Sequence, residues 1–177
     1  MTAIHRAAIL ALAAVLSAAP EAGARCVDDV VPARMIGAGQ FCVFGVCLYD
    51  AQLWAPHPPA GFDTPFALLL TYRHDVSGAR LVATGMTEIE RLAPAPLPVV
   101  TRDAWRADIA QAFTDVVRGD VLCGVYLPDH GARFYTNGRL TADIPDPVFA
   151  RAFFDIWLDP RTRAKSLRRQ LLGDTAR

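Results

Sequence analysis

The sequence lacks several features that would assign it to a common class of protein. It has no excess of either charge, because 18 Lys and Arg residues balance 18 Asp and Glu residues. A protein that holds nucleic acid by its phosphates needs a basic excess, so we expect no nucleic-acid partner. The 4 cysteines among 177 residues are too few for a fold built from disulfides. With 53% hydrophobic and 20% charged residues, the chain is expected to fold as a globular domain.

Motifs for catalysis and for cofactor binding are also missing. Gly37-Ala38-Gly39 looks like the start of a dinucleotide-binding loop, but neither a third glycine nor a helix follows it. The sequence contains no nucleophile elbow, no P-loop, and no His or Cys pair at metal-ligand spacing. His74-Asp75 is the best acid–base pair, yet neighbours on a strand face opposite ways. We therefore expect no cofactor and no metal ion.

The one long apolar run lies at the N-terminus. Residues 7–19 are almost all Ala, Leu, Ile and Val, and Pro20 ends the run. Ala22 and Ala24 supply the small residues that signal peptidase accepts, and the run is shorter than the ~20 residues of a membrane span. We expect a signal peptide over residues 1–24, cleaved after Ala24, and one domain over residues 25–177 that is periplasmic or secreted. The alternative is a retained anchor.

Two of the cysteines flank a candidate turn. If Phe44-Gly45 forms a two-residue hairpin turn, Cys42 and Cys47 face each other at a spacing that allows a disulfide. If the segment is instead one strand kinked at Gly45, the two side chains point to opposite faces. The sequence leaves both alternatives open, and four cysteines allow three pairings in all.

Apolar runs between turn residues predict most of the strands. Asn137-Gly138 is the strongest hairpin signal in the chain. The expected strands cover residues 33–39, 40–54, 66–72, 121–127, 132–136 and 139–144.

Helical periodicity and capping residues predict four helices. Ser77, Thr101 and Asp146 are the expected N-caps, and a last helix runs from about Thr162 to Gly173. On the first helix, Glu88, Glu90 and Arg91 are expected on the outer side. Strands, two helices, strands and two helices indicate an α+β fold, with an antiparallel sheet covered by helices on one side.

Together, several segments are similar to a known family. They are Gly37-Ala38-Gly39, FGVCLYDAQLW at residues 44–54, YLP at 126–128, FYTNGR at 134–139, the step at 144–146, and FARAFFDIWL at 149–158. In this order and spacing they resemble the bacterial exported branch of the chalcone isomerase-like superfamily. The resemblance covers roughly residues 30–172. It implies an open-faced β-sandwich, in which a large antiparallel sheet carries a layer of helices and a ligand lies in a cleft between them.

The same resemblance argues against catalysis. The isomerases of the superfamily use an Arg, a Thr and a Tyr, and here the matching positions are Gly39 or Gln40 for the Arg, Phe44 for the Thr, and Leu81 for the Tyr. The Arg stabilises a developing oxyanion, and a neutral Gln cannot offset a full charge. Arg80 lies one residue from the Tyr position and is the one candidate substitute. We expect a protein without enzymatic activity, and a guanidinium beside an open crevice, flanked by a phenol and a hydroxyl, would overturn that expectation.

Three hypotheses follow from the sequence. The first is an exported, non-enzymatic protein that binds an apolar, fatty-acid-like molecule, with Gln40, Tyr49, Tyr72 and Arg73 at the polar end of the site and Arg73 on a carboxylate. The second is an isomerase or intramolecular lyase for a chalcone-like phenol, and the third is a pocketless interaction domain. The basic C-terminal helix could touch an anionic membrane peripherally. The sequence identifies no protein partner.

Overall fold

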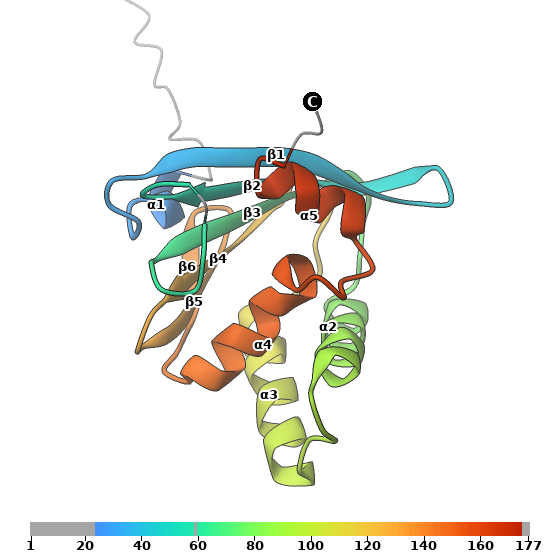
Figure 1. The fold of residues 1–177 in the computed structure, drawn as a ribbon. Coiled ribbons are helices and arrows are strands. Elements are labelled where there is room, and N and C mark those ends of the chain that lie inside the picture. The colour runs from blue at the N-terminus through green and yellow to red at the C-terminus, as the bar shows by residue number, and fades with distance from the viewer. Residues whose placement is uncertain (1–23, 59, 175–177) are drawn as a thin grey trace, which may run out of the picture.

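The computed structural model describes residues 24–58 and 60–174, which form a single antiparallel sheet with four helices on one face and one short helix on the other (Figure 1). Each strand pairs with the next along the chain, so the sheet is a meander in the order β1-β2-β3-β4-β5-β6. The strands are β1 (Arg34–Val43), β2 (Val46–Ala55), β3 (Phe66–Tyr72), β4 (Val121–Leu127), β5 (Gly131–Thr136) and β6 (Arg139–Ile144). The predicted α+β class is therefore confirmed.

The helices are α1 (Ala24–Val27), α2 (Gly78–Leu92), α3 (Val99–Ala112), α4 (Pro147–Leu158) and α5 (Lys165–Leu171). In Figure 1, α2 to α5 lie on one side of the sheet, and α1 lies against the other side. In the described part of the chain, none of these helices has both the length and the apolar character that crossing a membrane requires. The predicted signal peptide lies outside the described residues except for Ala24, so export stays a prediction.

Both expected hairpins are present. β1 and β2 are joined through Phe44 and Gly45, and β5 and β6 through Asn137 and Gly138. The first turn places Cys42 opposite Cys47, and the two form a disulfide. The hairpin alternative is therefore confirmed and the kinked continuous strand is wrong. The predicted break between residues 39 and 40 is also wrong, because β1 continues to Val43.

Local capping explains where two of the helices begin. Ser77 accepts a hydrogen bond from the backbone N–H of Arg80 at the start of α2, and Asp146 accepts from the first turn of α4, with Pro147 as the first helical residue. The predicted cap at Thr101 is wrong, because α3 begins at Val99 after Pro98. The last helix is shorter than expected and covers only Lys165–Leu171.

Two glycines explain how α5 packs on the sheet. A Cβ atom at Gly37 would collide with the backbone oxygens of Gln170 and Leu171, and one at Gly39 would collide with the Gln170 side chain. The absence of side chains at these positions lets the helix backbone approach β1 closely. The Gly-Ala-Gly segment therefore serves helix packing rather than phosphate binding.

The face of the sheet opposite the main helices carries a second, smaller core. Cys26 forms a disulfide with Cys123 of β4, across 97 residues of sequence. The buried residues around this bond are Val30, Ala67, Leu69 and Val125. The hydroxyl of Tyr135 also donates to Asp29 at 2.6 Å. This disulfide and its neighbours hold the N-terminal segment against what we call the outer face; the inner face is the one that carries α2 to α5.

Candidate functional site

A large cavity lies between the inner face of the sheet and the helices. Its volume is about 1030 Å³, at the upper end of ordinary small-molecule pockets, which span roughly 300–1,000 Å³. The wall on the sheet side is mostly apolar and includes Leu48, Leu68, Leu70 and Leu122. The wall on the helix side includes Leu81, Ile109, Phe113, Phe153, Ile156 and Trp157. A domain without a pocket, the third hypothesis, is incompatible with this cavity.

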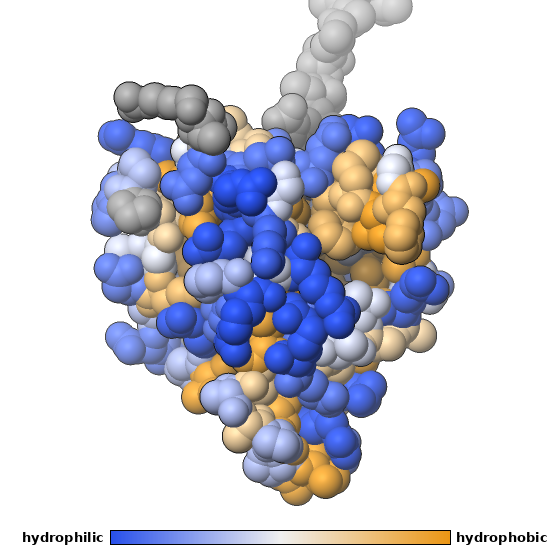
Figure 2. Space-filling view, turned by 45° about the vertical axis from the view of Figure 1, so that its right-hand side comes forward, coloured by the Kyte–Doolittle hydropathy of each residue, from blue (hydrophilic) through white to orange (hydrophobic). Residues whose placement is uncertain are grey.

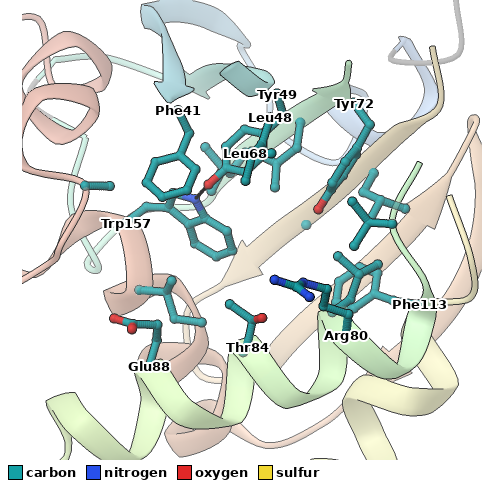
Figure 3. A pocket seen from close by; sticks show the side chains of 18 of the residues that line it. Phe41, Leu48, Tyr49, Leu68, Tyr72, Arg80, Thr84, Glu88, Phe113 and Trp157 are labelled. Carbon is teal, nitrogen blue, oxygen red and sulfur yellow. Dashed lines mark hydrogen bonds between the residues drawn. The ribbon is translucent and has the colours of Figure 1, made fainter. Parts of the chain in front are cut away.

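Three aromatic residues form a row across neighbouring strands at one end of the cavity. Phe41, Tyr49 and Tyr72 are register partners on β1, β2 and β3, so their side chains share the inner face. The ring centroids of Phe41 and Tyr49 lie 5.2 Å apart, and those of Tyr49 and Tyr72 lie 5.6 Å apart. The indole N–H of Trp157 donates to the Tyr49 hydroxyl at 3.0 Å (Figure 3). This bond fixes Tyr49, while the Tyr72 hydroxyl has no partner within the described residues.

Burial raises the pKa of both phenols. It raises the pKa of Tyr72 to about 12. It also raises the pKa of Tyr49 well above the ordinary range, although the hydrogen bond from Trp157 works in the opposite direction. Both hydroxyls therefore keep their protons near neutral pH, and that of Tyr72 is available as a donor to a ligand in the cavity.

α2 contributes a polar stripe to the cavity. Arg80, Thr84 and Glu88 follow one another at four-residue spacing, so they lie on the same side of the helix, and all three line the cavity. Figure 3 shows the three side chains rising from α2 toward the sheet, with the Arg80 guanidinium directed to the space beneath Tyr72. The stripe adds the cation of Arg80 to the wall of a mostly apolar volume.

The two charged members of the stripe differ in how they are compensated. Glu88 is only 8% exposed, and its carboxylate accepts from Arg91 at 2.6 Å and from Arg163 at 2.7 Å. The prediction that Glu88 lies on the outer side of the helix is therefore wrong. No acidic partner and no hydrogen bond of the Arg80 guanidinium is found among the described residues. Arg80 thus presents an uncompensated positive charge at the mouth, where its side chain is exposed.

The sequence-predicted ligand residues divide between the two faces of the sheet. Tyr49 and Tyr72 line the cavity. Gln40 and Arg73 do not, because both point to the outer face and bind the carboxylate of Asp50 at 3.0 and 2.8 Å. The Arg73 guanidinium holds the pKa of Asp50 below its ordinary value, with help from the bond from Gln40. As a correction, the cavity therefore takes Arg80 in place of Arg73 as its candidate for binding a carboxylate.

From the sequence, Arg80 is a candidate only as a substitute for a missing catalytic residue. The signal that could have found it is the spacing of Arg80, Thr84 and Glu88, which puts polar groups on one side of a helix that also has an apolar side. The structure brings Arg80 together with the phenol of Tyr72 and the hydroxyl of Thr84. A guanidinium beside an open cavity, flanked by a phenol and a hydroxyl, is the arrangement that counts against the expectation of a protein without enzymatic activity, so catalysis stays a candidate function of this cavity.

Comparison with known sequences identifies the family of the protein. The profile of the chalcone isomerase-like family matches residues 48–173, which is more than two thirds of the chain. The protein belongs to the chalcone isomerase-like family. A search of proteins with curated functions finds no match.

Among solved structures, the chain is similar to a fatty-acid binding protein of Arabidopsis thaliana, AtFAP1. The TM-score is 0.60 at 10% sequence identity, and the match covers 80% of this chain and 87% of the plant protein. At this identity the likeness establishes a shared fold.

Proposed function

We propose that the protein is an exported, non-enzymatic binding protein for a fatty-acid-like molecule, whose apolar chain occupies the cavity and whose carboxylate binds Arg80. The observation that carries this proposal is the unpaired guanidinium at the mouth of a mostly apolar volume of about 1030 Å³. Export rests on the predicted signal peptide over residues 1–24. Membership in the chalcone isomerase-like family, and the fold shared with the fatty-acid binding protein AtFAP1, support the proposal without naming the ligand.

The balance of donors and acceptors supports an anionic head. The cavity wall has several groups that lack a partner among the described residues, and each of them can donate: the N–H groups of Arg80, the hydroxyls of Tyr72 and Thr84, and the imidazole of His74. Of the carboxylates of the cavity wall, Glu88 binds two arginines, and Asp75 accepts one hydrogen bond, from the backbone N–H of Arg118 at 2.9 Å. A ligand that supplies acceptor oxygens completes this set, and a carboxylate does so with charge-assisted bonds.

Native mass spectrometry and a ligand series test this function. Protein purified from the exported compartment is expected to carry a co-purifying acyl compound that survives dilution. With stripped protein, dodecanoate is expected to bind at least about tenfold more tightly than dodecanol, because only the carboxylate gains the charge-assisted bonds to Arg80. Equal affinities, or no binding of either compound, would overturn the proposal.

An isomerase acting on a chalcone-like phenol is the second candidate, and the grouping of Arg80, Tyr72 and Thr84 favours it. A guanidinium in the cavity can stabilise the phenolate oxygen that develops in such a cyclisation. Against it, Phe44 and Leu81 stand at the positions that match the Thr and the Tyr of the isomerases. Chalcone cyclisation above the spontaneous rate, lost in Arg80→Met, would establish the enzyme; a wild-type rate equal to the spontaneous one would exclude this substrate.

A further inference from the structure

The tip of the β1–β2 hairpin exposes a cluster of apolar side chains. Phe44 is 103% exposed, and its neighbours Val43 and Val46 are 38% and 49% exposed. Figure 1 shows the hairpin extending beyond the rest of the sheet, and Figure 2 shows an apolar patch on this side of the molecule, bordered by hydrophilic side chains. Val43 and Phe44 also line the cavity, so the tip forms part of its rim. Contiguous apolar patches with a polar border are typical of interaction sites.

The fold itself gives no reason for an aromatic residue in this turn. Phe44 and Gly45 have φ values of +48° and +82°, close to the +50° and +77° of Asn137 and Gly138 in the β5–β6 turn. Asn-Gly is the usual sequence for this geometry, whereas a bulky residue in the left-handed region is strained. Asn137 also contributes to the fold, because its side chain accepts from the backbone N–H of Val121 and donates to Asp120. Phe44 is strained without being buried, which indicates a role at the surface.

A basic segment borders the same rim. Residues 160–173 contain five Lys and Arg residues and no Asp or Glu. Arg161 and Arg163 pair with Asp159 and Glu88, while Lys165 and Arg169 are exposed and have no acidic partner within the described residues. Arg163 and Phe44 both line the cavity, and α5 begins at Lys165, two residues after Arg163.

We propose that the hairpin tip and the basic segment over residues 161–169 together dock the protein on the surface of an anionic lipid bilayer. Aromatic and aliphatic side chains enter the boundary between headgroups and acyl chains, and neighbouring cations are attracted to anionic headgroups. Phe44, Val43 and Val46 supply the first contribution, and Lys165 and Arg169 supply the second. Docking in this way turns the mouth of the cavity toward the lipid, which gives an apolar ligand a path that avoids water. The docking surface goes beyond the proposed function, since it does not depend on which ligand the cavity holds.

Vesicle binding by the disulfide-bonded, ligand-stripped protein tests the proposal. Wild type is expected to sediment with vesicles of equal parts phosphatidylcholine and phosphatidylglycerol, and much less with phosphatidylcholine alone. Phe44→Asn, which suits the turn and removes the ring, is expected to weaken binding at least about tenfold, as is Lys165→Glu combined with Arg169→Glu. The control is Val100→Asn, because Val100 is 81% exposed on α3, away from the rim, and its replacement is expected to leave binding unchanged.

A second measurement detects insertion directly. In Phe44→Trp, the emission of the added indole is expected to be quenched by brominated acyl chains in these vesicles. Absence of vesicle binding by wild type, wild-type binding by Phe44→Asn, equal binding to uncharged vesicles, or no quenching in Phe44→Trp would each overturn the docking proposal. Titration with dodecanoate in the absence of vesicles reports separately on the proposed ligand function, so the failure of either proposal can be recognised by itself.

Discussion

The two faces of the sheet use their polar residues in different ways. On the outer face the charged groups bind one another: Asp50 binds Arg73, and Arg133 binds Asp143 at 3.0 Å. On the inner face, the guanidinium of Arg80 and the hydroxyl of Tyr72 face a cavity and have no protein partner in the described part of the chain. Paired surface groups contribute modestly to stability, whereas unpaired donors at a cavity are available to a ligand. Changes on the outer face should therefore alter stability, and changes on the inner face should alter binding.

The largest stability effect is expected from the outer-face disulfide. Replacing Cys26 and Cys123 by Ala opens a loop of 97 residues and should lower the free energy of unfolding by about 4.7 kcal/mol, with dodecanoate affinity of the folded protein unchanged. The matched control replaces Cys42 and Cys47, which are 5 residues apart, and should cost about 2 kcal/mol. Urea unfolding under oxidising conditions measures both. A larger loss of stability on removal of the Cys42–Cys47 disulfide would contradict the expectation that the Cys26–Cys123 disulfide stabilises the fold more.

Filling the cavity should abolish binding while preserving the fold. Thr84→Trp places an indole at the mouth, and we expect dodecanoate affinity to fall by about a hundredfold or more because the ring occupies the space of the ligand. The control is Ala38→Trp, on an exposed position of β1 outside the cavity lining. Isothermal titration calorimetry compares the two variants. Binding by Thr84→Trp at wild-type affinity would place the ligand elsewhere.

Tyr72 offers a smaller test, of binding and of pH dependence. Tyr72→Phe removes one neutral donor and should weaken dodecanoate binding by about 1 kcal/mol. Because burial raises the pKa of Tyr72 to about 12 in the folded protein, its contribution to stability is complete below the unfolded value of about 10 and is lost as the pH rises from 10 toward 12. Urea unfolding at alkaline pH should show a shallower loss for Tyr72→Phe than for wild type. Parallel curves would show that the phenol is not buried as described.

The exposed pair on the outer face should give the smallest effect. Arg73→Met removes an ion pair whose side chains are 44% and 39% exposed, so we expect a loss of less than about 1 kcal/mol of stability and none of affinity. The pKa of Asp50 is lowered in the folded state, so the contribution of the pair is present above the unfolded pKa of about 4 and is lost as the pH falls through the folded value. Unfolding curves of variant and wild type should therefore converge in acid. Weaker dodecanoate binding by Arg73→Met would contradict the division between the faces.

Much of the fold could be predicted because local signals agree with it. Strands 66–72, 121–127 and 139–144 have the predicted bounds, since each is an apolar or alternating run ended by turn residues. The N-caps at Ser77 and Asp146 could be predicted because Ser and Asp side chains accept hydrogen bonds from the free N–H groups at the start of a helix. The chalcone isomerase-like resemblance added the cleft between sheet and helices, and the cavity lies there.

The candidate site was harder to predict, because it depends on which side of each element faces the helices. Tyr72 and Arg73 are adjacent on the chain, so strand alternation alone forbids both from facing one cavity, and this test was available from the sequence. The burial of Glu88 could not be predicted from the sequence, since it depends on Arg163, which is 75 residues away. The pairing of Cys26 with Cys123 likewise follows from the packing of distant segments.

The most direct measurement varies both residue 80 and the headgroup of the ligand. Dodecanoate and dodecanol are each titrated into wild type and into Arg80→Met. Charged hydrogen bonds contribute about 1.5–3 kcal/mol, so the substitution should weaken dodecanoate binding by roughly tenfold to a hundredfold. Dodecanol, which lacks the charge, should bind both proteins alike. An equal loss for the two ligands, or a loss for neither, would contradict the claim that Arg80 binds the anionic head of an apolar ligand.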